Sequence, residues 1–209
     1  MKSSVLFLWA GILSAQPISV GVKGGVRLTG DLYSYWATSE SKLHTVGPMV
    51  TAGLPFGFRL EFDALYRRVG FRSANSDIYF GGSYTERDRG NSWEFPIVVR
   101  RALWRGIYAG IGYAPRVING SKHFDSFFVT SINPLITTHS ESNSPGSWDT
   151  THGVVGTVGI AKRVGPLRIA PEIRYTRWNS PAVNEYGSHG FSIQSTQNQV
   201  ELLVGISFP

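Results

Sequence analysis

The residue types best suited to chemistry lie together in one polar stretch, Thr138-His139-Ser140-Glu141-Ser142. A histidine base beside serine hydroxyls and a carboxylate supplies the ingredients of an activated serine nucleophile. A catalytic triad, however, is held together by a rigid frame and not by adjacency in the sequence. Neighbours in a serine-rich segment are more typical of a solvated loop, so the sequence predicts no catalytic activity.

Metal and phosphate chemistry have still less support. The chain contains no cysteine, which excludes thiolate metal sites and thiol nucleophiles. Two histidines at a loop rim would be able to share a metal ion, and four lie at expected loops or loop edges: His44, His123, His152 and His189. The glycine-rich run 153–159 lacks the Lys-Ser/Thr pair of a phosphate-binding loop. We therefore expect no metal site and no cofactor.

The basic residues do not form a nucleic-acid platform. The formal net charge is +6, spread along the whole sequence. Arg72, Arg87 and Arg89 are interleaved with acidic residues such as Glu86 and Asp88, which is typical of a solvated segment. Recognition of nucleic acid requires clustered basic residues, so we expect no nucleic-acid partner.

The N-terminus has the layout of a secretory signal peptide. Met1-Lys2 supplies a positive end, residues 5–13 form an apolar run, and Leu13-Ser14-Ala15 provides a small-residue exit. The run is too short for a membrane-spanning helix, and no other stretch approaches the ~20 apolar residues that such a helix needs. The sequence predicts a signal peptide over 1–15 and an exported mature chain over 16–209.

Apolar and polar residues alternate with a period of two along much of the chain, which predicts β-strands. Any functional site would therefore be held by strands. From residue 18 the chain reads ISVGVKGGVRL, with valines and isoleucine on one face and Ser19, Lys23 and Arg27 on the other. Eight segments show this alternation: 18–28, 44–54, 58–67, 93–100, 107–114, 153–163, 167–176 and 199–208. The sequence therefore predicts an all-β chain of eight strands.

The connections between these segments alternate in length. Long connections cover 29–43, 73–90, 119–151 and 179–196, and short ones cover 55–57, 103–106 and 164–166. An up-and-down transmembrane barrel has long loops at one end and short turns at the other. Aromatic residues near the strand ends suit the girdles of such a barrel, namely Tyr33, Tyr35, Trp36, Trp93 and Trp178 at one rim, and Phe56, Phe58, Trp104 and Phe208 at the other. We expect an eight-stranded antiparallel barrel.

In such a barrel the apolar faces meet lipid and the polar faces fill the lumen. Eleven charged residues fall on the polar faces: Lys23, Arg27, Arg59, Glu61, Asp63, Glu94, Arg100, Arg116, Glu172, Arg174 and Glu201. Charges held away from water persist when they are paired, and an eight-stranded barrel is just wide enough for side chains to fill. The sequence predicts a packed lumen network and no open pore.

Four prolines lie inside the proposed strands, namely Pro48, Pro96, Pro115 and Pro171. Each removes a ladder hydrogen bond from a sheet that has no edge. A β-bulge at each position would accommodate the missing donor.

The motif WEFPIVVR at 93–100, followed by a tight turn and YAGIG at 108–112, resembles the central signature of the bacterial outer-membrane β-barrel domain proteins. These are small eight-stranded barrels related to the transmembrane domains of OmpA and OmpX. The run PEIRY at 171–175 is similar to the family's penultimate strand, and VGVKGG at 20–25 to its first. Members commonly end on an aromatic residue that the barrel-assembly machinery reads, whereas here Pro209 follows Phe208. The resemblance implies an outer-membrane monomer in contact with lipid, including lipopolysaccharide, and with the assembly machinery during biogenesis.

These observations together predict an integral outer-membrane barrel with a structural or surface-interaction role through its four long loops. Two alternatives stay open. A membrane-embedded lipid-modifying enzyme would bring a histidine, a serine and a carboxylate together near the outer rim. A soluble secreted lipocalin-like binder would instead turn its apolar faces inward, around a ligand cavity.

Overall fold

The computed structural model describes residues 18–33, 37–77, 82–132, 135–145, 150–186 and 192–208. The predicted signal peptide lies outside these ranges, as do Tyr35, Trp36, His189 and Pro209. Within them, no helix is long and apolar enough to cross a membrane.

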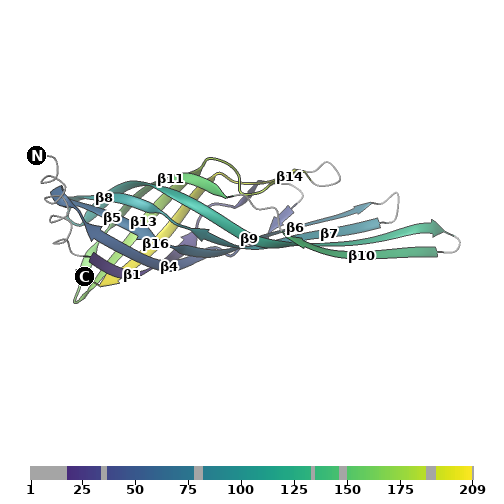
Figure 1. Ribbon diagram of the computed structural model, residues 1–209, viewed down its shortest axis with the longest axis horizontal. Coiled ribbons are helices and arrows are strands. Elements are labelled where there is room, and N and C mark those ends of the chain that lie inside the picture. Colours follow the sequence, from purple (N-terminus) through teal and green to yellow (C-terminus); the bar gives the residue numbers. More distant parts are fainter. Residues whose placement is uncertain are drawn as a thin grey trace, which may run out of the picture.

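The described strands close into one antiparallel barrel (Figure 1). Its walls are formed by β1 (Ile18–Arg27), β4 (His44–Gly53), β5 (Phe58–Asp63), β6 (Leu65–Asp77), β7 (Gly82–Glu94), β8 (Ile97–Trp104), β9 (Ile107–Ile132), β11 (Thr151–Ile160), β12 (Lys162–Val164), β13 (Leu167–Trp178) and β16 (Asn198–Phe208). The pairs β5–β6, β7–β8 and β11–β12 are each one barrel strand with a short interruption, so the described chain contributes eight. Closure comes from β16, which pairs with both β13 and β1. The predicted eight-stranded antiparallel barrel is confirmed.

Short turns gather at one end of the barrel. They are the 3-10 turn η1 (Pro55–Gly57), the Arg105-Gly106 turn and the Gly165-Pro166 turn. Arg105 and Gly106 both have positive φ angles, 47° and 86°, as a two-residue hairpin turn requires when its twist matches that of the flanking strands. The first residues of β1 and the last of β16 pair at this same end.

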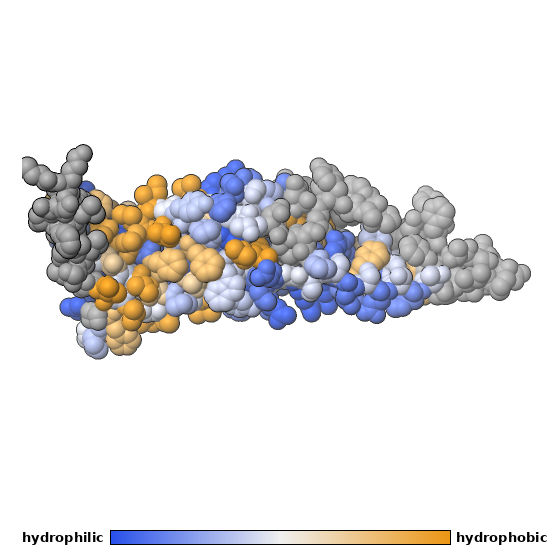
Figure 2. All heavy atoms as spheres, in the orientation of Figure 1, coloured by the Kyte–Doolittle hydropathy of each residue, from blue (hydrophilic) through white to orange (hydrophobic). Residues whose placement is uncertain are grey.

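The apolar faces of the strands point outward. An apolar belt surrounds the barrel, formed by Val20, Val22, Val46, Val50, Phe62, Ile97, Val99, Ile111, Val154, Val158, Ile173, Leu202, Val204 and Ile206, all of which are exposed. Figure 2 shows hydrophobic side chains over the barrel and hydrophilic ones over the opposite half of the molecule. Inward positions carry buried Ser19, Lys23, Thr51 and Glu61 instead. The lipocalin-like alternative is therefore wrong, because its apolar faces would line the inside.

The four prolines are accommodated without bulges, contrary to the expectation from the sequence. Strand assignment is interrupted at Ala64 opposite Pro48, at Phe95-Pro96, and at Ala161 close to Pro171. The pairing resumes on the far side of each interruption in the same register, as in Met49↔Asp63 followed by Val46↔Tyr66. The proline carbonyls still accept hydrogen bonds from the neighbouring strand: Ala64 N–H donates to Pro48 O, and Phe95 N–H donates to Pro115 O. Each proline thus removes one donor and leaves the ladder aligned.

Two segments predicted to be loops are strands. Residues 73–90 lie mostly in the β6–β7 hairpin, and residues 119–151 in β9 and β10 (Leu135–Pro145). The outer parts of these strands (70–77, 82–90, 119–132 and 135–145) form a sheet, here called the arm, that extends away from the turn end (Figure 1). A short strand, β3 (Ala37–Ser39), pairs with β6. A separate small sheet joins β2 (Leu32–Tyr33), β14 (Asn184–Tyr186) and β15 (Ser192–Ser195).

Close strand contact at inward glycines predicts a measurable cost of substitution. A Cβ at the inward Gly25 would meet backbone atoms of Leu202 and Leu203, whereas a Cβ at Gly156, on the outward face of β11, would meet nothing within 4 Å. Gly25→Ala is expected to lower the free energy of unfolding by about 1–3 kcal/mol, because the neighbouring backbone must shift. Gly156→Ala is the matched control and is expected to have no destabilising effect. Urea unfolding of both variants in detergent micelles checks this, and equal stabilities would contradict it.

Candidate functional site

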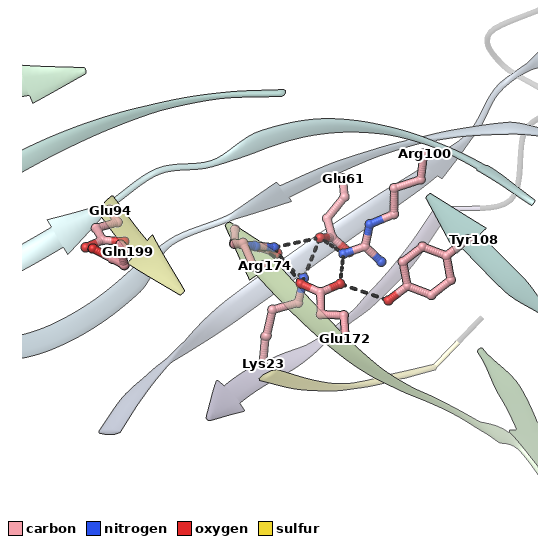
Figure 3. A network of polar contacts seen from close by, with 9 residues as sticks. Lys23, Glu61, Glu94, Arg100, Tyr108, Glu172, Arg174 and Gln199 are labelled. Carbon is pink, nitrogen blue, oxygen red and sulfur yellow. Dashed lines mark hydrogen bonds and ion pairs between the residues drawn. The ribbon is translucent and has the colours of Figure 1, made fainter. Parts of the chain in front are cut away.

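The centre of the lumen holds three cations and three carboxylates joined by ion pairs: Lys23, Arg100, Arg174, Glu61, Asp63 and Glu172. Figure 3 labels all of these residues except Asp63. Lys23 on β1 reaches across to the carboxylates of β5. Its Nζ pairs with Glu61 Oε1 and lies 3.1 Å from Asp63 Oδ2. It also lies 3.2 Å from Glu172 Oε1. We refer to these six residues as the central cluster.

Two arginines complete the central cluster from other strands. Arg174 Nη2 on β13 lies 2.7 Å from Asp63 Oδ2 and 2.9 Å from Glu172 Oε1. Arg100 Nη2 on β8 pairs with Glu61 and lies 2.7 Å from Glu172 Oε2. Tyr108 donates its hydroxyl to the same Glu172 oxygen at 2.8 Å, and its ring lies 4.7 Å from the Arg100 guanidinium carbon. Glu172 therefore contacts all three cations and the phenol.

A second group, here called the outer cluster, lies nearer the arm and consists of Arg67, Glu94, Arg116, Trp178, Gln199 and Glu201. Arg67 Nη2 lies 3.2 Å from Glu94 Oε1, and its Nη1 lies 3.8 Å from Glu201 Oε1. Figure 3 places Glu94 and Gln199 side by side, apart from the central cluster. Gln199 donates to Glu94 Oε2 at 3.1 Å and accepts a hydrogen bond from Trp178 Nε1 at 3.0 Å.

Arg116 joins the outer cluster through a ring and a hydroxyl. Its guanidinium carbon lies 3.9 Å from the centre of the Trp178 ring, and its Nε donates to Thr151 Oγ1 at 3.0 Å. Trp178 was expected in an aromatic girdle at the rim, which is wrong, since it is 1% exposed and points into the lumen. A buried indole needs a partner for its N–H, and Gln199 provides one. Trp93 does lie on the outside, where it packs against Tyr66 at a ring distance of 5.2 Å.

The structure buries ten of the eleven residues assigned to the lumen network. Arg59 is the exception, because it lies at the turn end and forms no ion pair with any described residue. Arg27 is buried but bonds mainly to loop oxygens, with Nη2 lying 2.9 Å from Thr196 Oγ1 and 3.0 Å from Gly30 O. Four further members were not identified from the sequence: Arg67, Tyr108, Trp178 and Gln199. Arg67, Tyr108 and Gln199 fall on the polar faces of the alternating segments 58–67, 107–114 and 199–208, so the alternation could have identified these three.

The serine-rich stretch does not converge into a catalytic site. His139 and Ser140 are consecutive residues of β10, so their side chains project from opposite faces of the arm. His139 Nε2 lies 2.8 Å from Asp125 Oδ1 on β9, and both side chains are exposed. In the described part of the chain, no three histidine or acidic side chains are placed to hold a metal ion. The glycine-rich run 153–159 is part of strand β11.

An ion pair outside the barrel wall predicts a pH dependence. Glu40, in the connection before β4, accepts hydrogen bonds from Arg87 of β7 at 2.7 Å and 2.5 Å. The Arg87 side chain lowers the pKa of the Glu40 carboxyl below its ordinary value of 4.5. A carboxyl with a depressed folded pKa stabilises the fold above its unfolded pKa, and this contribution is lost as the pH falls through the folded pKa.

We therefore expect the connection before β4 to be held less tightly against β7 on acidification below pH 4.5, because the Glu40–Arg87 ion pair is lost. The amide of Glu40, which donates to Gly70 O, reports it through its hydrogen-exchange protection factor. In the wild type the protection factor should decrease as the pH is lowered. In Glu40→Gln it should be low at every pH. If the protection factor of Glu40→Gln changes with pH as that of the wild type does, the ion pair does not hold this connection against β7.

Comparison with known proteins gives structural likeness only. No protein-family model matches the chain, and no curated protein matches it. The crystal structure of Neisserial surface protein A (NspA) matches at 11% identity over 91% of this chain and 96% of that one, with a TM-score of 0.37. The structure of Ail, the attachment invasion locus protein of Yersinia pestis, in complex with the heparin analogue sucrose octasulfate, matches at 6% identity over 91% and 99%, with a TM-score of 0.36.

The fold follows from the chain's own topology. Its described strands close through β1 and β16, its apolar faces point outward, and its charged faces fill the lumen. This is the arrangement of a barrel whose outer surface meets lipid. The chain is an eight-stranded antiparallel β-barrel with the fold of the small outer-membrane barrels that its sequence resembles.

Proposed function

We propose that this protein is an integral outer-membrane barrel that holds the arm above the membrane for contact with surface partners. The observation that carries the proposal is the apolar belt around a closed barrel whose inside is charged. In water this large apolar surface would be exposed to solvent, which is unfavourable. Lipid is able to cover it, because the backbone groups of a closed barrel are already paired with one another. The predicted signal peptide supports export to that membrane.

The lumen is proposed to be a plug and not a conduction path. The ion-paired residues of the central cluster reach inward from β1, β5, β8 and β13 and are at most 8% exposed. Opening a path for a solute would break several ion pairs in a low-dielectric interior, which costs several kcal/mol for each charge left alone. The central cluster thus serves to fix the strands, and no catalytic step is assigned to it.

The arm is the part proposed to meet other molecules. Its last strand, β10, pairs only with β9 among the described residues, so one edge of the arm carries free backbone donors and acceptors. An exposed sheet edge is able to accept an extended segment of a partner as an additional strand. The side chains of residues 138–144 of β10 are exposed and polar, which keeps this edge soluble until a partner binds.

Lipopolysaccharide is the proposed lipid partner on the outer leaflet. An open groove of about 510 Å³ lies on the outside of the barrel at the base of the arm. It is lined by Arg68, Arg89, Gly90, Asn91, Asn119, Gly120 and Ser121. Arginines directly above an apolar belt are suited to lipid phosphates, since guanidinium binds phosphate in a bidentate manner.

Single-cysteine labelling tests the proposal, because the natural chain contains no cysteine. Ser140→Cys on the arm should react with a membrane-impermeant maleimide in intact Gram-negative cells. Arg105→Cys in the turn should react only after the outer membrane is permeabilised. Both variants should fractionate with the outer membrane and migrate differently on SDS gels before and after boiling. Equal labelling of both positions in intact cells, or recovery of the protein in the soluble periplasm, would refute the proposal.

A further inference from the structure

The turn end of the barrel contains a cavity that neither the central cluster nor the apolar belt explains. Its volume is about 410 Å³, within the range of small-ligand pockets. It is lined by Arg59, Arg100, Ala102, Gly106, Tyr108, Ala161, Arg163 and Arg168. Ala102, Gly106 and Ala161 have small or absent side chains, so the space between the arginines stays open.

The charge in this cavity is unbalanced. Arg100 is paired with Glu61 and Glu172 at the deep end. Arg59, Arg163 and Arg168 form no ion pair with any residue in the described ranges, and no acidic side chain lines the cavity. The positive charges of Arg163 and Arg100 act on Arg59, and those of Arg59, Arg100 and Arg163 act on Arg168. Arg59 and Arg168 are half-buried, whereas Arg163 is exposed. Guanidinium groups that repel one another favour an anion between them.

We propose that this cavity binds a phosphate-bearing anion. Three guanidinium groups supply planar, paired N–H donors that match phosphate oxygens. A phosphate monoester carries a charge of about −1.5 to −2 at neutral pH, which offsets most of the positive charge of the three unpaired arginines. Tyr108 donates its hydroxyl to Glu172, so the arginines are the groups that recognise the ligand. In the orientation given by the proposed function, the anion comes from the periplasm, either as a soluble phosphate compound or as a phospholipid headgroup.

The test uses the full-length mature protein in nanodiscs of zwitterionic phosphatidylcholine, titrated with inorganic phosphate and with pyrophosphate. The wild type should bind pyrophosphate with a salt-dependent affinity and should be stabilised against urea as the ligand is added, since only the folded state binds. The double variant Arg59→Gln/Arg168→Gln should bind at least about tenfold more weakly, because two charge-assisted contacts are lost. Without ligand it should be at least as stable as the wild type, because repulsion is relieved.

Arg101→Gln is the matched control. Arg101 lies at the same end but points out of the lumen, with its guanidinium 5.3 Å from the Phe58 ring. Its loss should change the affinity less than about twofold. Equal weakening by Arg101→Gln, or equal stabilisation by sulfate and chloride at matched ionic strength, would overturn the proposal, because either points to unspecific screening.

Nanodiscs that contain phosphatidylglycerol distinguish the two sources of phosphate. Stabilisation by this lipid that depends on Arg59 and Arg168, without binding of pyrophosphate, identifies a headgroup as the ligand. Binding of pyrophosphate in either lipid identifies a soluble anion. Absence of both effects at millimolar ligand refutes the site, and leaves the labelling test of membrane orientation unaffected.

Discussion

Glu172→Gln is expected to lower the free energy of unfolding by about 3–5 kcal/mol, the cost of breaking a buried ion pair from one side. The substitution preserves the volume of the side chain and removes only its charge. Lys23, Arg100 and Arg174 would then share the two remaining carboxylates of Glu61 and Asp63. Urea titration in detergent micelles measures the loss, and the unboiled protein should unfold in SDS at a lower temperature than the wild type.

A paired substitution separates charge imbalance from lost packing. Lys23→Met/Glu172→Gln leaves Arg100 and Arg174 facing Glu61 and Asp63, so the central cluster is neutral again. The double variant should recover most of the stability, because replacing both partners of a buried pair is often nearly neutral. Glu141→Gln on the arm, 57% exposed, is the control and should change stability by less than about 0.5 kcal/mol. A double variant as unstable as Glu172→Gln alone would show that charge balance is not what stabilises the lumen.

The barrel wall was predictable from the sequence because each wall strand has different surroundings on its two faces. Where lipid meets one face and the lumen the other, apolar and polar residues must alternate, and the segments at 18–28 and 167–176 show this clearly. The alternation also fixed the inward direction of Lys23, Glu172 and Arg174, which lie in the central cluster.

The arm was not predictable by the same reasoning. It stands outside the barrel wall, so no lipid-facing side imposes a hydrophobic period. Runs such as TERDRGN at 85–91 therefore have the composition of a loop, although they are hydrogen-bonded strands in β7. Their strand character follows from pairing with β6 and β9, which is a non-local property that composition alone does not contain.

The exact partners within the lumen also depend on tertiary position. Arg59 lies on the same face of its strand as Glu61. It is two residues nearer the turn, however, and lines the cavity at the turn end of the barrel. Arg116 was assigned to the lumen network from its charge alone, and the sequence did not indicate that its guanidinium lies against the Trp178 ring. Which inward residues meet depends on the stagger between neighbouring strands around the barrel, and a single sequence does not state this stagger.

Ile173 supplies the sharpest test of what surrounds the barrel. It follows Glu172 directly in β13, is 56% exposed on the opposite face, and pairs with Val158 and Leu202, two other members of the apolar belt. Ile173→Arg is expected to lower the free energy of unfolding in phospholipid vesicles by about 2–4 kcal/mol, as for an arginine placed at the bilayer midplane. An exposed isoleucine of a water-soluble barrel would tolerate the same change within about 0.5 kcal/mol.

The consecutive positions 172 and 173 make the result interpretable, because one faces the lumen and the other the surroundings. Thr138→Arg, on the exposed arm, adds the same charge without entering lipid and should leave stability unchanged. Thinner bilayers bring position 173 closer to the interface and should reduce the cost of Ile173→Arg, since this cost falls with distance from the midplane. The cost of Glu172→Gln should stay the same in every bilayer. If Ile173→Arg is as stable as the wild type in vesicles, the apolar belt does not face lipid, and the barrel belongs in another environment.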